Sequence, residues 1–377
     1  MYAQRGGKKQ LRAMIAVYTK PVLMQKKEKE LFKQLCSFQS DRFDKELLQH
    51  ASPAVLGHLF FNRMQGAAYS VLKKNECLGA VNREFRNSLK GAYEQNIERN
   101  RSFFQCVRLL SGLIAQCGCS AAMLKGALLC RLYPEGCRTA NDIDLLVHPR
   151  DVGLLGRALT EAGFRQGNIR NGEFIPAARR EIIESKMTRG ETVPYILEIG
   201  LPYMRFLEVD INFSLDYKNS APDVLERMLN DTVVNEGIVT LNRSDFLIHL
   251  ACHLYKEAAT LPWVKMKRDM TLYKYADLYL LLDRMSDSEI SEFFRRAEER
   301  GLGKICAFAV LQTAELFDFK APALLTQAKE ALLEEKDFLH RVVSPGEKKT
   351  YLYRTRDITE RFFLDDRVSD LQEEDGR

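Results

Sequence analysis

The hydrophobic pattern of the chain changes at Cys119, and this change constrains the fold more than any other feature. Up to that point apolar residues recur every three or four positions, whereas beyond it short apolar runs alternate with helical segments. The runs SAAML (120–124) and NDIDLLV (141–147) predict buried strands, and ALLCRLY (127–133) and DVGLLGRALTEAG (151–163) predict helices. This alternation of strands and helices indicates an α/β core.

Helical segments are expected on both sides of this core. Apolar residues spaced by four between Ala80 and Gln116 predict one long amphipathic helix that ends near Gly118. Its Lys and Arg residues fit a solvated helix face better than a nucleic-acid site. Helical spacing returns from Ser244 onward.

The remaining segments predict strands or irregular structure. YILEI (195–199) and MRFLEVDINF (204–213) are expected to be strands, whereas the polar residues 165–194 predict an insertion with at most short structure. The acidic tail from Asp370 is expected to be disordered. The N-terminal MYAQRGGKKQLRAM is expected to be a flexible leader, because no apolar signal-peptide segment follows it.

These predictions combine into an α+β chain with a small mixed β-sheet. We expect a helical region at 1–118, a core at 119–218 and a helical region with the disordered tail at 219–377. The 46% hydrophobic and 28% charged residues fit a globular protein. The net charge of +5 suits a nucleoside triphosphate as well as a nucleic acid, so charge alone does not separate them.

The nine cysteines favour a cytoplasmic protein. Their number is odd, no pair has CxxC spacing, and several lie in apolar runs, as buried thiols do in a reducing compartment. No stretch is long and apolar enough to cross a bilayer, so we expect no membrane partner.

Two carboxylates on the second predicted strand point to metal chemistry. Asp142 and Asp144 share one strand face, and Ile143 between them faces the core. A lone DxD pair is more often a solvated strand edge, but here the strand continues into buried-type residues. Carboxylates held together in such a place suit Mg²⁺, with Mn²⁺ as the alternative.

Lys125 and Gly126 lie between the first predicted strand and its helix. A glycine there allows backbone to approach a ligand closely, and a helix beginning at Ala127 would turn free N–H groups toward phosphate. Lys125 could offset phosphate charge. A simple turn glycine is the alternative interpretation.

A further acidic strand follows about seventy residues later. In FLEVDINFSL, the polar residues Glu208, Asp210 and Asn212 alternate with apolar ones, so they share one face. A solvent-facing edge strand would have the same pattern. If this strand lies beside Asp142 and Asp144, Asp210 completes a carboxylate triad able to hold two metal ions.

The order of these motifs resembles the DNA polymerase beta-like nucleotidyltransferase superfamily. More narrowly, LKGALLCRLYP and DIDLLV resemble the signatures of a family of uncharacterised nucleotidyltransferases, VDINFSL resembles its third-carboxylate strand, and LIHLACHLYKEA resembles its helical half. The resemblance covers roughly residues 119 to 320. It implies a nucleotidyltransferase core flanked by N-terminal and C-terminal helical regions.

The resemblance also implies roles for individual residues. Asp142, Asp144 and Asp210 would be the catalytic metal ligands, and Lys125, Gly126 and Arg138 would bind the nucleotide. The chain departs from the superfamily at two positions. Ala127 stands where Ser or Gly is usual after the glycine, and Asn212 stands where His is common; neither change removes a carboxylate.

Two histidines and a basic segment are weaker candidates. His249 and His253 have zinc-ligand spacing but no evident third ligand, so packing is the simpler interpretation. By the resemblance, His253 and Asp277 would line the acceptor pocket or bond each other. The basic residues of WVKMKRDM (263–270) fit either a mobile loop near an anionic substrate or a solvated charge run.

The expected function is metal-dependent transfer of a nucleoside monophosphate from an NTP, such as ATP, to an acceptor hydroxyl or amine. The acceptor could be a small molecule, a protein or a tRNA. Two alternatives stay open at this point: a toxin-like enzyme that nucleotidylates tRNA or protein, and an inactive nucleotide-binding module.

Overall fold

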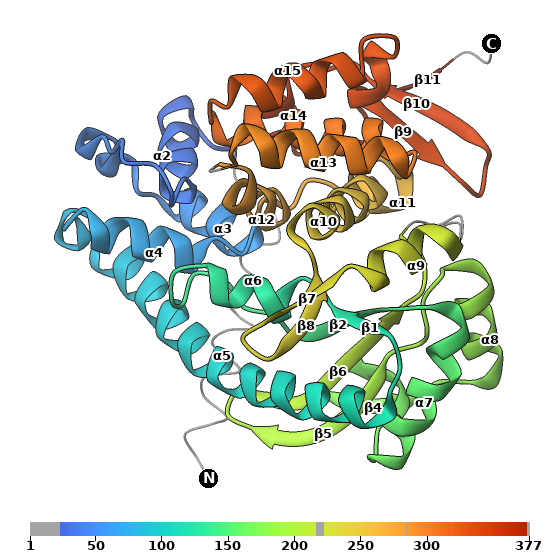
Figure 1. The fold of residues 1–377 in the computed structure, drawn as a ribbon. Coiled ribbons are helices and arrows are strands. Elements are labelled where there is room, and N and C mark those ends of the chain that lie inside the picture. Colours follow the sequence, from blue (N-terminus) through green and yellow to red (C-terminus); the bar gives the residue numbers. More distant parts are fainter. Residues whose placement is uncertain (1–22, 216–221, 284, 375–377) are drawn as a thin grey trace.

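The computed structural model describes residues 23–215, 222–283 and 285–374. It has a mixed sheet with helical regions on both sides, which confirms the predicted α+β class. In Figure 1 the C-terminal helices are stacked above the sheet, and helices α2–α4 lie beside them. The predicted N-terminal leader lies outside the described residues.

The N-terminal helices end in one long helix that runs alongside the sheet. This helix, α5 (Arg83–Cys117), begins at Asn82, whose side chain accepts a hydrogen bond from the Phe85 N–H, and ends at the left-handed Gly118. The spacing of apolar residues predicted this helix within a few residues. It is preceded by α2 (Lys26–Cys36), η1 (Lys45–His50), α3 (Pro53–Phe61), α4 (Gln65–Lys74) and η2 (Leu78–Ala80).

Within the described residues, the central sheet has eight strands in the order β4-β3-β5-β6-β2-β1-β8-β7. It is mixed, because β2 pairs antiparallel with β1 but parallel with β6. Its strands are β1 (Ala121–Met123), β2 (Asp142–Val147), β3 (Arg165–Arg170), β4 (Glu173–Pro176), β5 (Tyr195–Leu201), β6 (Met204–Asn212), β7 (Thr232–Asn235) and β8 (Ile238–Leu241). The helices among them are α6 (Gly126–Leu132), α7 (Val152–Glu161), α8 (Arg179–Thr188) and α9 (Pro222–Asn230), with η3 (Pro149–Asp151).

The prediction of an insertion with at most short structure at 165–194 is wrong. This segment forms the β3–β4 hairpin and helix α8, and β3 extends the sheet beyond β5. The turn residues Asn171 and Gly172 have φ angles of 54° and 82°, as a type I′ hairpin turn requires. The strands are polar because they lie at the sheet edge and are largely exposed, which concealed them in the sequence.

The C-terminal region is also less uniformly helical than predicted. Strands β7 and β8 join the central sheet, and β9, β10 and β11 form a second sheet. The tail predicted to be disordered supplies β11, while residues 375–377 lie outside the described residues. The elements after β8 are α10 (Arg243–Ala258), α11 (Leu261–Lys265), α12 (Leu272–Leu282), α13 (Asp287–Glu299), α14 (Gly303–Phe317), α15 (Pro322–Ala331), η4 (Lys336–His340), β9 (Arg341–Ser344), β10 (Lys349–Tyr353), α16 (Ile358–Phe362) and β11 (Leu371–Glu373).

Two large hydrophobic clusters hold these parts together. One lies between the sheet, the second half of α5 and α7, and includes Phe103 and Ile143. The other joins the N-terminal helices to the C-terminal helices, where the Phe32 and Phe362 rings stack with centroids 5.9 Å apart. Helices from both ends of the chain therefore share one core beside the sheet.

Candidate active site

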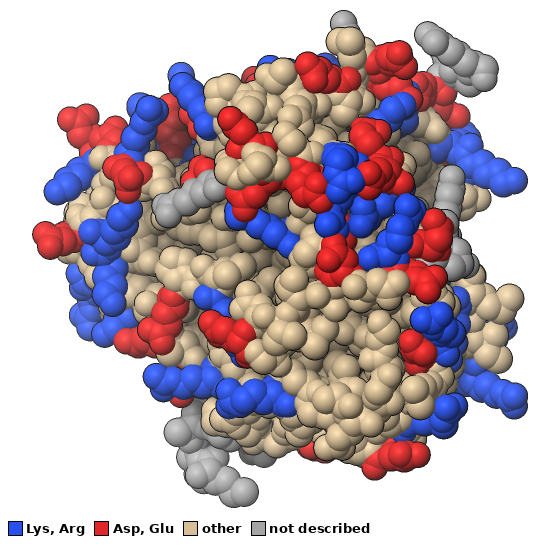
Figure 2. Space-filling model, viewed as in Figure 1, with Lys and Arg blue, Asp and Glu red and all other residues tan. Residues whose placement is uncertain are grey.

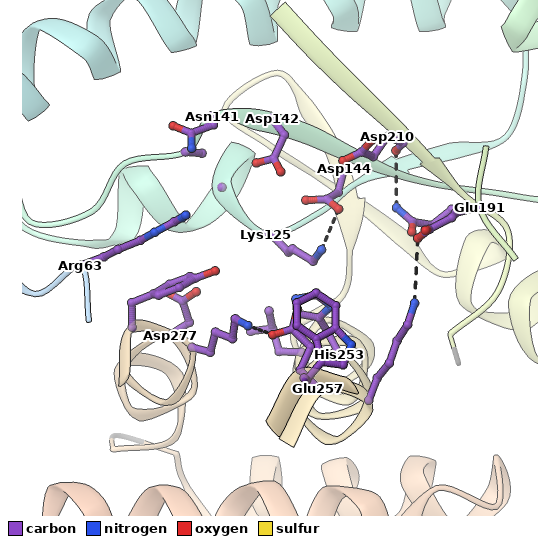
Figure 3. Close-up of a pocket in the computed structure, with 18 of the residues that line it drawn as sticks. Arg63, Lys125, Asn141, Asp142, Asp144, Glu191, Asp210, His253, Glu257 and Asp277 are labelled. Carbon is purple, nitrogen blue, oxygen red and sulfur yellow. Dashed lines mark hydrogen bonds and ion pairs between the residues drawn. The ribbon is translucent and has the colours of Figure 1, made fainter. Parts of the chain in front are cut away.

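The acidic residues of β2 and β6 meet on one face of the sheet. The two strands are parallel neighbours in a register that pairs Asp144 with Asp210 and Asp142 with Glu208. Ile143 is fully buried on the opposite face. All three aspartates line a cavity of about 640 Å³ between the sheet and helices α10 and α12 (Figure 3). The structure thus brings together acids from segments far apart in the sequence.

The charges of these carboxylates are poorly compensated. Burial and the neighbouring Asp144 raise the pKa of Asp142. Burial, followed by Asp144, Asp142 and Glu208, raises the pKa of Asp210 well above its ordinary value. The pKa of Glu208 is raised for the same reasons, by burial and by Asp142 and Asp144. A bound cation would relieve this repulsion.

Lys125 supplies a positive charge to the cluster. Its Nζ lies 2.7 Å from Oδ1 of Asp144, which is 6% exposed. Burial opposes the ammonium charge, but the attraction of Asp144, Asp142 and Asp210 outweighs it and raises the pKa of Lys125. The backbone at Lys125 is strained, with φ 43° and ψ −114°. Such strain in a residue other than glycine is common at functional sites.

Gly126 is required by packing. A Cβ atom there would lie 2.3 Å from Cβ of Ala140, in the segment that leads into β2. The sequence predicted free N–H groups at the start of this helix, but two of them are already bonded. The Ala127 N–H donates to the Leu124 carbonyl, and the Leu128 N–H donates to the Lys125 carbonyl. The tight turn at Lys125 closes these bonds. Gly126 itself lines the cavity.

Arg138 reaches the cavity in a fixed position. Its guanidinium makes two bonds to Asp277 on α12, of 2.9 and 3.0 Å, and Asp277 also accepts a hydrogen bond from the Tyr133 hydroxyl. The guanidinium lies 4.8 Å from the ring centroid of Tyr273. Arg138 therefore joins the strand loop to the helical wall, and its predicted contact with phosphate stays a prediction.

Helices α10 and α12 form the wall opposite the sheet. His253 lies 3.4 Å from Glu257, and Lys274 forms an ion pair with the same glutamate. Asp277 bonds Arg138, so the predicted pairing of His253 with Asp277 is not the one formed. His249 is buried and does not line the cavity; burial lowers its pKa to about 3.

The segment after α10 contributes its apolar residues to the site. Trp263 and Met266 line the cavity, whereas Lys265, Lys267 and Arg268 are exposed and do not. This arrangement agrees with the interpretation of the basic residues as a solvated charge run.

Several lining residues were not singled out from the sequence as site residues. Arg63 follows helix α3, has a left-handed φ of 57°, and projects into the cavity from the N-terminal region (Figure 3). Glu191 belongs to the stretch that was taken for an insertion, yet it forms a bridge to Asn212. No sequence signal marks Arg63. No sequence signal marks the pairing of residues 190–192 with the end of β6 either.

The site fits a divalent cation in its chemistry but is not a preformed cage. Among the residues that the structure describes, no three His, Cys, Asp or Glu side chains come together as a metal site. The donors available are carboxylates, which Mg²⁺ prefers. The raised pKa values of Asp142 and Asp210 reflect burial and mutual repulsion of negative charge, of which Lys125 offsets only a part. The residues present therefore suit a hard divalent cation.

A family model matches most of the chain. No curated protein matches the chain. Residues 53–318 match the family described as uncharacterised nucleotidyltransferase, a range that includes every aspartate of the site and most of the helices around it. Within the described parts of the chain, no helix has both the length and the apolar character needed to cross a membrane. The match supports nucleotidyl transfer as the general activity, and the chain belongs to this family of uncharacterised nucleotidyltransferases.

Proposed function

We propose that the protein transfers a nucleoside monophosphate from a nucleoside triphosphate, such as ATP, to an acceptor hydroxyl or amine, with Mg²⁺ or Mn²⁺ as cofactor. One observation carries this proposal. Asp144 and Asp210 are register partners on adjacent parallel strands, and Asp142 lies on the same face of the same cavity. These three residues would hold the metal, which supplies charge stabilisation to the reacting phosphate when bound.

The cationic residues of the cavity support a polyphosphate substrate. Lys125, Arg63, Lys256 and Lys274 line the cavity from four different elements or loops. The Arg63 guanidinium stacks on Tyr273 at 4.9 Å and forms no ion pair within the described residues, so it has a charge available for phosphate. Fixed positive groups that offset phosphate charge are the main requirement for in-line transfer.

Exchange of Asp142 for Asn tests the proposal. This variant keeps the side-chain shape but removes one negative charge, so Mg²⁺-dependent transfer of an α-phosphate label should fall by at least about a hundredfold. Circular dichroism should show an unchanged fold. The exposed Asp223, which pairs with Arg227 on α9, provides a matched control, and Asp223→Asn should keep full activity.

Full activity of Asp142→Asn would contradict the proposed function. Tight nucleotide binding by calorimetry, together with no transfer to any acceptor, would instead favour an inactive nucleotide-binding module. Label on tRNA or protein would favour a toxin-like enzyme.

A further inference from the structure

A second cavity, of about 310 Å³, adjoins the carboxylate site on the far side of β6. It shares Asp210, Arg189 and Glu191 with the larger cavity, so the two spaces meet at Asp210. Its wall is formed by α8, by residues 189–194, by Asn168 of β3, and by Glu208 and Asp210, which lie on the same face of β6 as the carboxylate site. Residues 190–192 are held against the end of β6, because the backbone N–H of Thr192 donates to the Ile211 carbonyl at 2.9 Å.

The two cavities differ in charge. The lining of the larger one is balanced, with six cations (Arg63, Lys125, Arg138, Arg189, Lys256 and Lys274) and six carboxylates (Asp142, Asp144, Glu191, Asp210, Glu257 and Asp277). The smaller one contains five carboxylates and one cation, which are Glu181, Glu184, Glu191, Glu208, Asp210 and Arg189. With the proposed divalent cation bound to the aspartates, the first space would carry net positive charge and attract a polyphosphate, whereas the second space repels it.

Most of these carboxylates are not neutralised by the protein. Glu181 accepts a hydrogen bond from the neutral amide of Asn168 at 3.0 Å, and Glu191 lies 3.9 Å from Lys256. Within the described parts of the chain, Glu184 and Glu208 form no ion pair. The acidic wall therefore keeps an excess of negative charge.

A buried hydroxyl in the same wall is an independent sign of a missing partner. Thr192 is 3% exposed and lines the smaller cavity. Its Oγ1 has no hydrogen-bond partner among the described residues. Buried hydroxyls are normally bonded, so a ligand in this cavity would satisfy a group that the protein leaves unsatisfied.

The geometry of in-line transfer assigns the smaller cavity to the acceptor. The attacking atom must approach the α-phosphorus opposite the leaving pyrophosphate. With the polyphosphate held among the cations of the larger cavity, the side opposite is the one beyond Asp210. We propose that the smaller cavity binds the acceptor, and that the acceptor is a small cationic molecule that carries amino groups. This inference rests on the proposed function.

The transfer step balances without a further reactant. An acceptor oxygen or nitrogen forms a bond to the α-phosphorus, and the bond from that phosphorus to the bridging oxygen breaks. Pyrophosphate leaves with the electron pair, and the acceptor proton passes to the Asp210 carboxylate. The negative wall excludes acceptors that carry phosphate, including the end of a tRNA. Figure 2 shows Lys and Arg side chains interspersed with Asp and Glu over the face that it draws.

A binding experiment tests the cavity without requiring turnover. Spermidine serves as the probe, titrated by calorimetry into the full chain with Mg²⁺ and a non-hydrolysable ATP analogue. The double variant Glu181→Gln/Glu184→Gln should weaken spermidine binding by about fivefold, because it removes two exposed carboxylates that would pair with the ammonium groups of spermidine. Affinity for the ATP analogue should not change. Glu330→Gln/Glu334→Gln removes the same charge from exposed positions at the end of α15 and should change neither affinity.

Equal spermidine affinity in the wild type and the Glu181/Glu184 variant would overturn the proposal. A transfer assay provides the second arm. The protein is incubated with α-labelled triphosphates and cell metabolites, and the products are then separated on cation and anion exchangers. Label in the cationic fraction supports the proposal, whereas label in the anionic fraction or on RNA overturns it. Absence of label in every fraction, with the spermidine difference intact, counts against nucleotidyl transfer and not against the cation-binding cavity.

Discussion

Replacing Asp210 by Asn should stabilise the protein when no divalent cation is present. Asp210 and Asp144 are register partners on adjacent strands, so their carboxylates lie about 5 Å apart. At an effective dielectric constant of about 20, two unit charges at that distance repel each other by roughly 3 kcal/mol. Lys125 offsets part of this repulsion through its 2.7 Å contact with Asp144. We therefore expect the free energy of unfolding to rise by about 1–3 kcal/mol.

Urea denaturation at neutral pH with EDTA measures this effect. Asp223→Asn serves as the control, because Asp223 is exposed and pairs with Arg227 of its own helix; its substitution should change the free energy of unfolding by less than about 0.5 kcal/mol. An Asp210→Asn protein that is no more stable than the wild type would refute the reasoning. It would mean that the carboxylates do not repel each other in the folded state.

The effect of Asp210→Asn on the free energy of unfolding should depend on pH. Burial and the neighbouring acids raise the folded-state pKa of Asp210, so the folded protein binds a proton more readily than the unfolded chain does. The free-energy cost of keeping Asp210 charged in the folded protein is therefore present at neutral pH. It disappears as the pH falls through the raised pKa toward the ordinary value of about 4. The stability advantage of Asp210→Asn should shrink over that interval. Saturating Mg²⁺ at neutral pH should stabilise the wild type more than the variant.

Two further predictions concern the packing around the site. Gly126→Ala should destabilise the fold by about 1–3 kcal/mol, because its Cβ would lie 2.3 Å from that of Ala140; Gly112→Ala, in open space on α5, should be neutral or stabilising in the same urea assay. Arg138→Ala should cost about 3 kcal/mol, because it leaves the buried Asp277 without its cationic partner. The double variant with Asp277→Ala should lose less than the sum of the two single changes, whereas additive losses would show that the pair is not coupled.

The sequence predicted the centre of this fold because its residues are patterned strongly. The alternation around Asp142 and around Asp210 identified β2 and β6, and the four-residue spacing identified α5 almost to its ends. A buried strand or a long amphipathic helix leaves such a period in the sequence. That β2 and β6 would be adjacent was a hypothesis, which the register of the sheet confirms.

The β3–β4 edge of the sheet was missed because its exposed strands carry no apolar alternation. In β3 and β4 most side chains are accessible to solvent, and only the Asn171–Gly172 turn marks the hairpin. The short strands after residue 340 were missed for a related reason. They pair within a small separate sheet, and β11 has no fully buried residue.

The walls of the site depend on contacts that no local pattern encodes. Arg63 reaches the cavity from the N-terminal helices, and Tyr273 and Lys274 reach it from α12. Asn62 helps to fix this arrangement, since its side-chain oxygen accepts a hydrogen bond from the Leu272 N–H at the start of α12. The carboxylates could be predicted from one strand each, whereas the cations that face them come from packing of distant helices.

The most direct test of the central claim is a crystal structure of the protein with Mn²⁺ and a triphosphate whose α–β bridge is non-hydrolysable. Anomalous scattering would locate the metal independently of the protein atoms. The account predicts a manganese peak coordinated by Asp142 and Asp144, with Asp210 beside it and the triphosphate directed toward Lys125 and Arg63. A nucleotide bound elsewhere, or a metal peak that none of the three aspartates contacts, would contradict it.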